Sequence, residues 1–262
     1  MAVCGATGRM GRAIARIARN AGGFELIGGI ARSSEPTMVI PEEAGPLIAS
    51  SQVVIDVSRP DFLGRILELH GERLAGRALI VGTTGLQQEQ EAALDALARR
   101  AAVLVAANFS LGVNLLLELV RRAANALPPS EFDAEIVEAH HRDKVDAPSG
   151  TALALANAVT NGRGTELDTQ RRDGRSGRTG VRPAGQIGLH AVRGGGVVGE
   201  HRVLFLGTRE RIELAHAALD RDVFAEGALA AARWLAGRQP GRYTMADVLG
   251  AGTGWTTSRS AT

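Results

Sequence analysis

The stretch GATGRMG, residues 5–11, decides the fold of this 262-residue chain. It follows the short apolar run AVC and precedes residues 9–20, where Met10, Ile14 and Ile17 share one helical face. Glycine lets backbone approach a pyrophosphate closely, and the start of a helix favours anions. The spacing G-x-x-G-x-x-G is a variant of the dinucleotide fingerprint. Glycine turns also occur for packing alone, but the position between a strand and a helix favours dinucleotide binding.

Beyond this turn, short apolar runs alternate with amphipathic stretches. We expect further strands at 24–30, 53–58, 78–85 and 103–109, with helices after the third strand and over residues 87–100. Such alternation predicts a parallel sheet with helices on both faces. The fold class is therefore α/β, with a doubly wound, Rossmann-like parallel sheet domain.

The pattern changes after the helix expected at 112–127, where PPS interrupts the chain. A strand at 132–141 and a helix at 150–159 precede a long loop, 161–185, which we interpret as a mobile lid. Three strand-like runs follow, and they predict a second α+β domain on a mixed or antiparallel sheet. We expect a dinucleotide-binding domain at 1–110 that is completed by 221–262, through a helix at 223–237 that returns to it. The substrate-binding and oligomerisation domain is expected at 111–220, and residues 250–262 read as a disordered tail.

Composition limits the class of protein. Apolar residues make up 45% of the chain and charged residues 22%, while the formal net charge is only +2. We therefore expect no nucleic-acid partner. The lone Cys4 suits a reducing compartment, no apolar run reaches about 18 residues, and the N-terminus lacks the apolar core of a signal peptide. We expect a cytoplasmic protein with no membrane partner and no metal site.

One residue stands out by its type. The chain has 30 basic residues, and Lys144 is the only lysine. It lies four positions after His140 in HHRDKVDAPSGTA, residues 140–152, ahead of a helix start that can hold a carboxylate. Singly, a histidine at a strand end or a lysine in a loop is usually structural. Together they favour a catalytic site, because histidine titrates nearest neutral pH. The remaining histidines (His70, His190, His201 and His216) are given no role, and neither is Asp56.

Three strand ends are candidate cofactor contacts. Open parallel sheets bind ligands at the carboxyl ends of their strands, where GTTG (82–85) and AANFS (106–110) lie, although both also suit ordinary turns. The second strand ends in ARSS (31–34), without the carboxylate that usually binds a ribose 2′-hydroxyl. Arg32 and its serines suit a 2′-phosphate, which favours NADPH over NADH, but a solvated turn would read the same way.

These motifs, in this order, carry a family resemblance. GATGRMG, VGTTG, AANFSLGVN, EAHHRDKVDAPSGTAL and AVRGGGVVGEH resemble the 4-hydroxy-tetrahydrodipicolinate reductase family, also called dihydrodipicolinate reductase, over nearly the whole chain. The resemblance implies reduction of a cyclic dicarboxylate by NADH or NADPH with loss of water, in lysine and diaminopimelate biosynthesis. It also implies a homotetramer built through the sheet of the second domain.

The resemblance also implies roles for individual residues. His140 is expected to be the acid/base residue and Lys144 the proton donor. Substrate would be bound by His141, Gly150 and Thr151, and by Ser149 of the same helix start. The expected cofactor contacts are Gly5, Ala6, Thr7, Gly8, Arg9, Met10, Arg32, Gly82, Thr83, Thr84, Ala106, Ala107, Asn108 and Phe109.

Two alternatives remain open from the sequence. Another NAD(P)-dependent reductase or amino-acid dehydrogenase with the same two-domain plan would need a different set of residues around 140–151. A nucleotide-sensing binding module would not need the histidine pair with the lone lysine. Turnover that depends on freshly generated dicarboxylate precursor separates a reductase from a sensor.

Overall fold

The computed structural model describes residues 1–33 and 36–250, and the chain divides into two compact units. Unit 1 comprises residues 1–111 together with the segment from 222 onward, and unit 2 comprises residues 112–221. Ser34, which belongs to the expected phosphate-binding turn, and the expected disordered tail beyond residue 250 lie outside the described residues.

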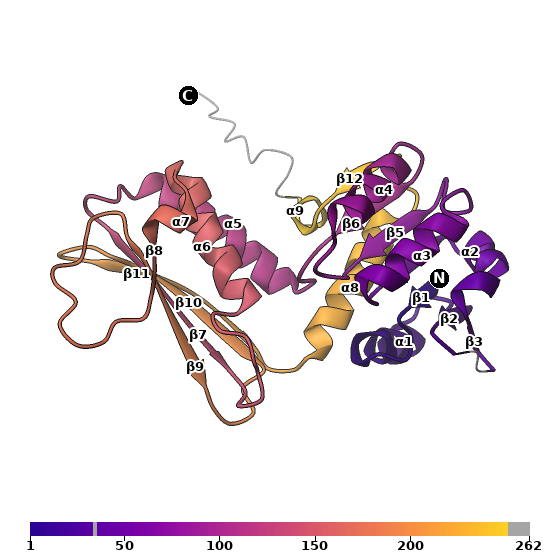
Figure 1. Cartoon of the computed structure of the whole chain (residues 1–262), viewed down its shortest axis with the longest axis horizontal. Coiled ribbons are helices and arrows are strands. Elements are labelled where there is room, and N and C mark those ends of the chain that lie inside the picture. Colours follow the sequence, from indigo (N-terminus) through magenta and orange to yellow (C-terminus); the bar gives the residue numbers. More distant parts are fainter. Residues whose placement is uncertain (34–35, 251–262) are drawn as a thin grey trace, which may run out of the picture. The chain divides into compact units, whose positions relative to one another are not determined.

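Unit 1 is built on a parallel sheet of seven strands in the order β12-β6-β5-β4-β1-β2-β3 (Figure 1). Every neighbouring pair in it is parallel. The strands are β1 (Ala2–Cys4), β2 (Gly28–Ile30), β3 (Met38–Val39), β4 (Val53–Asp56), β5 (Ala78–Val81), β6 (Ala102–Val105) and β12 (Gly241–Tyr243). The chain order reverses between β1 and β4, so the glycine turn after β1 lies at the point where parallel sheets bind ligands.

Helices cover both faces of this sheet, and each face has its own apolar core. The helices of unit 1 are α1 (Arg9–Ala21), α2 (Gly45–Ser50), α3 (Pro60–His70), α4 (Gln88–Ala98), α8 (Asp222–Leu235) and α9 (Met245–Val248), with a 3₁₀ turn η1 at Pro41–Glu43. One core joins α1 and α8 to the sheet through residues such as Val3, Ile55 and Ile80. The other joins α2, α3 and α4 to the opposite face through the alternate strand positions, such as Val54 and Leu79.

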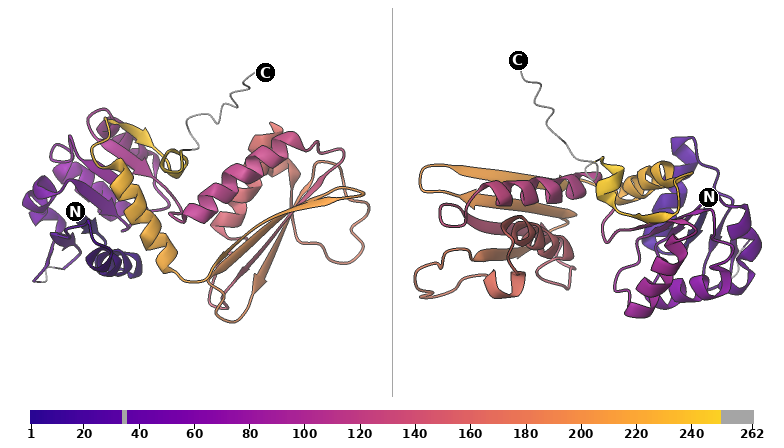
Figure 2. Two further views of the ribbon diagram at one scale, coloured as in Figure 1. Left: turned by 180° about the vertical axis from the view of Figure 1, so that it is seen from behind. Right: turned by 90° about the horizontal axis from the view of Figure 1, so that it is seen from above.

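Unit 2 is built on a mixed five-stranded sheet in the order β11-β10-β7-β9-β8. Its strands are β7 (Asp133–His140), β8 (Arg171–Asp173), β9 (Ile187–Arg193), β10 (Gly199–Leu206) and β11 (Arg211–Ala218). The strand β7 pairs in parallel with β9 and antiparallel with β10. Figure 2 shows α5 (Leu111–Ala126) and α6 (Gly150–Arg163) on one side of this sheet, where a third apolar core forms.

The predicted fold class is confirmed, with local corrections. The expected strand at 24–30 is strand only from Gly28, and the sequence reading missed the edge strands β3 and β12 and the short helix α2. The segment 161–185 is not one long loop, because it contains α7 (Leu167–Gln170) and the edge strand β8. Arg175 and Arg182 then tie its last part to Glu135 on β7. Movement of this segment as a lid stays a prediction.

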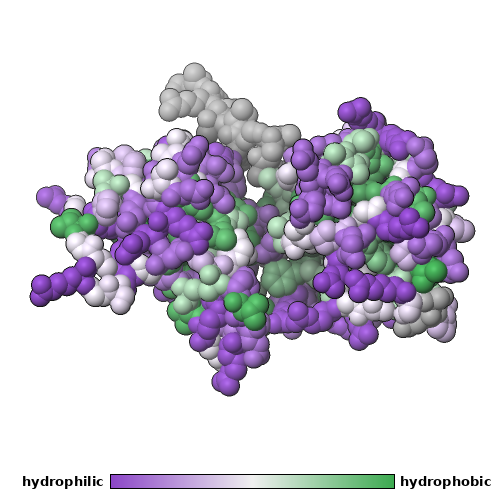
Figure 3. Space-filling view, viewed as in Figure 1, coloured by the Kyte–Doolittle hydropathy of each residue, from purple (hydrophilic) through white to green (hydrophobic). Residues whose placement is uncertain are grey.

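The face in Figure 3 is mainly hydrophilic, with hydrophobic residues scattered among polar ones. Within residues 1–33 and 36–250, no helix has both the length and the apolar character that a membrane crossing needs.

Candidate functional site

The glycine turn of unit 1 is shaped by two positions that exclude a side chain. Gly5 has φ of 76°, and a Cβ there would lie 2.7 Å from the carbonyl oxygen of Val57, just beyond β4. A Cβ on Gly11 would lie 2.3 Å from the Gly5 carbonyl oxygen, so α1 can approach the turn only with glycine there. The turn is closed by the N–H of Gly8, which donates to Gly5 O at 2.9 Å. The turn therefore packs tightly against the segment that follows β4 and against the first turn of α1.

The start of α1 is suited to an anion. Gly8 is the residue that precedes the helix, no side chain caps it, and the first turn carries no acidic residue. Thr7, Gly8 and Arg9 are exposed there, while Ala6 is buried against the sheet. The first N–H groups of a helix and its dipole favour a phosphate at such an end. The residues present thus fit the pyrophosphate of a dinucleotide.

The ends of β4 and β5 are joined by a buried carboxyl group. Asp56 is fully buried and accepts hydrogen bonds from the hydroxyls of Ser58 and Thr83. The Thr83 hydroxyl also accepts the backbone N–H of Ser58 at 3.0 Å. Burial raises the pKa of Asp56 to about 6, although these hydrogen bonds act in the opposite direction. The Thr83 side chain is therefore committed to the protein, whereas Gly82 is half-buried and Thr84 is exposed.

The loop after β6 is held by an aromatic anchor. Phe109 is buried in the core shared with α8, and a Cβ on Gly82 would lie 2.4 Å from its ring. A Cβ on Gly227 of α8 would lie 1.9 Å from the Phe109 carbonyl oxygen. Ala106, Ala107 and Asn108 precede this anchor and are half-buried or exposed. Phe109 thus fixes the loop that presents these three residues.

The expected phosphate site at the end of β2 has an acidic neighbour. Arg32 is exposed, and its guanidinium lies 3.7 Å from the carboxylate of Asp61 on α3. At that distance and exposure the ion pair is weak, so Arg32 can exchange this partner for a ligand.

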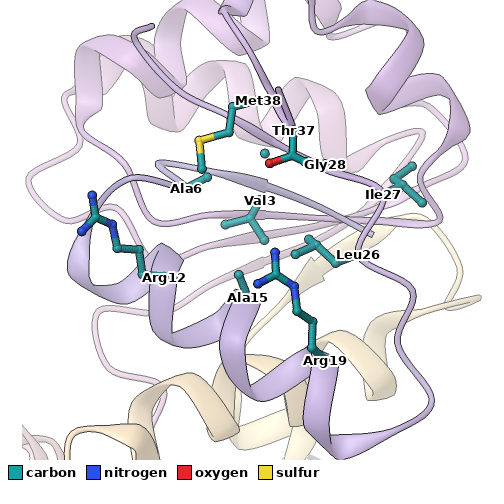
Figure 4. Close-up of a pocket in the computed structure, with 11 residues that line it drawn as sticks. Val3, Ala6, Arg12, Ala15, Arg19, Leu26, Ile27, Gly28, Thr37 and Met38 are labelled. Atoms are coloured by element: carbon teal, nitrogen blue, oxygen red, sulfur yellow. The ribbon is translucent and has the colours of Figure 1, made fainter. Parts of the chain in front are cut away.

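Figure 4 shows a pocket of the same unit that is lined by residues of α1 and of the strands β1, β2 and β3. It has a volume of about 260 Å³ and an apolar floor that includes Val3, Leu26 and Met38. Arg12 and Arg19 of α1 reach over it. Of the expected cofactor contacts, only Ala6 lines this pocket. The dinucleotide features described above therefore do not coincide with it.

In unit 2 the predicted acid/base residue lies at the end of β7. His140 is buried, and its Nδ1 is 2.6 Å from Oε2 of Glu138, two residues earlier on the same side of the strand. Arg193 lies opposite His140 on the neighbouring strand β9. Its guanidinium donates two hydrogen bonds to the Glu138 carboxylate, at 2.7 and 2.8 Å. Burial lowers the pKa of His140, and Glu138 partly offsets this effect. A carboxylate–histidine pair therefore occupies the strand end.

The same carboxylate holds the start of α6. Glu138 Oε1 accepts the N–H of Ser149 at 3.0 Å, and Ser149 Oγ caps the helix by accepting the N–H of Ala152. Gly150 and Thr151 form the first turn of this helix, which contains no acidic residue. Ser149 Oγ also lies 3.2 Å from Nε2 of His201, a buried residue whose pKa burial lowers to about 4. The helix start thus combines N–H groups with a neutral histidine.

Lys144 and His141 have separate partners. The Lys144 Nζ donates to Asp146 Oδ1 at 2.8 Å, and Lys144 retains about a fifth of its side-chain exposure. Its charge acts on both His140 and His201, lowering the pKa of each. His141 instead accepts a hydrogen bond from Arg221 at Nε2, 3.0 Å away. The two adjacent histidines therefore point to different neighbours, as alternate positions of a strand predict.

Three residues of this cluster were missed in the sequence reading, namely Glu138, Arg193 and His201. His201 was given no role there, yet its ring meets that of His140 edge-on, with centroids 5.2 Å apart. The spacing of Glu138 and His140 on one strand was a usable signal. The other two positions depend on strand pairing, because His201 is opposite Glu138 on β10 and Arg193 is opposite His140 on β9. Within residues 1–33 and 36–250, no three His, Cys, Asp or Glu side chains gather as metal ligands.

A doubly wound sheet with a glycine turn at its switch point, joined to a unit with a buried histidine–carboxylate site, defines a two-domain NAD(P)-dependent oxidoreductase. Residues 1–109 match the family described as dihydrodipicolinate reductase, N-terminus, and residues 112–249 match its C-terminus. The chain belongs to the dihydrodipicolinate reductase family.

Individual relatives agree with this assignment. The chain is 46% identical over 267 residues to the 4-hydroxy-tetrahydrodipicolinate reductase of Methylocella silvestris, covering 96% of this chain and 97% of that protein. It is 44% identical over 252 residues to the reductase of the same name from Caulobacter vibrioides, covering 95% and 96%. The dipicolinate-bound dihydrodipicolinate reductase of Paenisporosarcina sp. TG-14 has the same fold, with a TM-score of 0.75 at 24% identity, over 93% of this chain and 96% of that one.

Proposed function

We propose that this protein reduces 4-hydroxy-tetrahydrodipicolinate to tetrahydrodipicolinate with loss of water, in lysine and diaminopimelate biosynthesis. The observation that carries the proposal is the identity of 44–46% to reductases of that name over at least 95% of the chain. The cluster of His140, Lys144 and the α6 start in unit 2 supports it, because a dicarboxylate substrate needs cations, backbone donors and a proton source.

The cofactor is NAD(P)H, as in the family. When bound, it supplies the hydride for the reduction. The turn between Gly5 and Met10 and the start of α1 would hold its pyrophosphate, because that helix end has no cap and no acid. The ends of β5 and β6, at Gly82–Thr84 and Ala106–Phe109, would form the nicotinamide side. Of these residues, Thr83 and Phe109 would take part through their backbone, since both side chains are buried in the protein.

The substrate carboxylates would be held in two ways. One would accept N–H groups of Gly150 and Thr151 at the start of α6, beside the hydroxyl of Ser149. The other would lie against the Lys144 ammonium and His141. Lys144 is paired with the exposed Asp146, so a substrate carboxylate can compete for its ammonium group.

Two side chains would transfer the proton that the reduction requires. Hydride addition to a conjugated imine leaves negative charge on the nitrogen side, which an acid must neutralise. His140 would act as the acid/base residue and Lys144 as the proton donor. The Lys144 charge lowers the pKa of His140, so the two groups influence each other electrostatically.

We also propose that NADPH is preferred to NADH. Arg32 follows the end of β2, where Ala31 is buried and no carboxylate is available to bind a ribose 2′-hydroxyl. Because the ion pair between Arg32 and Asp61 is weak, the Arg32 guanidinium can bind a 2′-phosphate instead. The negative charge of Asp61 would repel that phosphate and so limit the preference for NADPH.

We propose a homotetramer assembled through unit 2. Its helices α5 and α6 cover one face of the five-stranded sheet. On the other face, which no described helix of this unit covers, Val137 and Ala139 face outward and Val192 is 52% exposed. Ala215 and Ala217 of β11 belong to the same surface, together with the charged Glu200 and Arg202 of β10. Light scattering of the full chain tests this assembly, and a monomer over a range of concentrations would contradict it.

The decisive experiment is a coupled assay. Purified protein is mixed with NADPH and with substrate generated in place by a dihydrodipicolinate synthase, and the loss of NADPH absorbance is followed. Oxidation that requires every component supports the reductase. Cofactor binding without oxidation would support a nucleotide sensor instead, and oxidation with other imino or keto acids alone would support a different dehydrogenase.

A further inference from the structure

The buried carboxylate of Glu138 is held by hydrogen bonds from several parts of unit 2. It is 1% exposed, and its two oxygens accept hydrogen bonds from His140, Ser149 and both terminal nitrogens of Arg193. These donors come from three elements: β7 itself, β9 and the segment that starts α6. Burying a carboxylate costs several kcal/mol unless such partners are present. The network therefore keeps the group ionised, and its pKa lies below the ordinary value because the hydrogen bonds from Arg193, His140 and Ser149 outweigh burial.

An ionised carboxylate constrains the histidine beside it. It can only accept hydrogen bonds, so the proton of the neutral imidazole must be on Nδ1 of His140, 2.6 Å away. The nitrogen that is left for chemistry is Nε2. A Cβ on Gly199, the first residue of β10, would lie 3.1 Å from this atom, so glycine there leaves room beside it. The sequence thus provides both a fixed tautomer and space at the reactive nitrogen.

We propose that Glu138 is a positioning residue for the reduction, which orients His140 with Nε2 free and couples that orientation to the start of α6. The proposal rests on the proposed function for its catalytic meaning. Through Ser149, the same carboxylate holds the N–H groups that would bind a substrate carboxylate. Proton transfer and substrate binding would then share one anchor, so that neither group can shift without the other.

The matched control is another carboxylate of the same strand. Glu135 is also buried on β7 and also receives arginine and histidine partners, namely Arg175, Arg182 and His190. Its side chain points to the other face of the sheet, since residues 135 and 138 are an odd number of positions apart. Glu135→Gln therefore removes a comparable charge without changing the environment of His140.

The first experiment compares the pH dependence of kcat in Glu138→Gln, Glu138→Asp and Glu135→Gln. The charged or titratable groups that act on His140 include Glu138, Lys144, Arg193 and His201. Removing the only acid among them should move the limb that belongs to His140 to lower pH. We expect kcat to fall about 10- to 100-fold in Glu138→Gln, as when the carboxylate partner of a functional histidine is lost, with the Kd for NADPH unchanged. Glu138→Asp should keep the wild-type limb, and Glu135→Gln should keep both the limb and kcat within a few-fold.

The second experiment needs no variant at position 138. The ring ¹⁵N shifts of the wild-type protein report which nitrogen carries the proton, and the signal of His140 among the six histidines is assigned by its loss in His140→Asn. We expect the Nδ1–H tautomer above the His140 pKa. An Nε2–H tautomer, or a Glu138→Gln enzyme with wild-type kcat and pH limb, would overturn the positioning role. Absence of turnover in the wild type would instead refute the proposed function, because the tautomer is measured without substrate.

Discussion

Replacing Asp56 by asparagine should change how the stability of unit 1 depends on pH. The Asp56 pKa is raised from 3.8 to about 6 by burial, and a shift of one pKa unit corresponds to about 1.36 kcal/mol. The folded state therefore holds this proton more tightly than the unfolded state. Between about pH 4 and pH 6 the unfolded chain loses the proton first, so the free energy of unfolding falls as pH rises, by about 3 kcal/mol in total. An asparagine at position 56 has the same side-chain shape but cannot ionise. The free energy of unfolding of Asp56→Asn should therefore not fall in this way as pH rises.

The assay is urea unfolding of wild type and Asp56→Asn at several pH values from 4 to 7.5. Trp234, which packs against Tyr243 in unit 1, reports the transition by fluorescence, and a Trp255→Phe background makes it the only tryptophan. The expected result is a difference in free energy of unfolding that shifts by about 3 kcal/mol in favour of Asp56→Asn from pH 4 to pH 7.5. Asp61→Asn, which removes a carboxylate that is 73% exposed, is the control. A difference between Asp56→Asn and wild type that stays constant over this range would refute the reasoning.

The other predictions concern the proposed catalytic and cofactor residues. His140→Ala should lower kcat by about 10²–10⁴ with NADPH affinity nearly unchanged, and steady-state kinetics with fluorescence titration check both values. Lys144→Arg should keep the fold and NADPH binding but lose at least about 10² in kcat, because a guanidinium does not release a proton near neutral pH; a rate within a few-fold of wild type would leave an electrostatic role only. Arg32→Ala should lower the ratio of kcat/KM for NADPH over NADH about tenfold or more, since a charged hydrogen bond contributes about 1.5–3 kcal/mol, and an unchanged ratio would rule out a phosphate contact. Gly11→Ala should lower the free energy of unfolding by about 1–3 kcal/mol, because its Cβ would lie 2.3 Å from the Gly5 carbonyl oxygen, and thermal melts that match wild type would contradict that steric argument.

The doubly wound unit could be predicted because its signals are local. Buried strands such as β4, with Val53, Val54 and Ile55 in succession, have continuous apolar runs, and most are followed by a helix with its own periodicity. The edge strands β3 and β12 escaped the prediction because they are two and three residues long and only partly buried. Short edge strands owe their conformation to a single neighbour, and their own side chains do not specify it.

The candidate site was predictable only in part for a similar reason. His140 and Lys144 could be recognised from their types and spacing in one segment. Arg193 and His201 lie more than fifty positions away, and only the pairing of β9 and β10 with β7 brings them to His140. The hydrogen bond between Asp56 and Thr83 could not be predicted either. The two residues are 27 positions apart, and a carboxyl group at the end of a buried strand does not indicate which group will donate to it.

Because α8 follows unit 2 in the chain but packs in unit 1, it affects the order in which the two units fold during translation. The core that α1 shares with the sheet is completed by buried residues of α8, such as Ala228 and Leu235. A ribosome delivers these residues only after all of unit 2, which is a continuous segment from 112 to 221. Unit 2 can therefore complete its core during translation, while residues 1–111 still lack the part of their core that α8 supplies. In the growing chain, unit 2 is therefore complete before unit 1. Until α8 is synthesised, the apolar surface that α8 later buries is what a chaperone would have to shield.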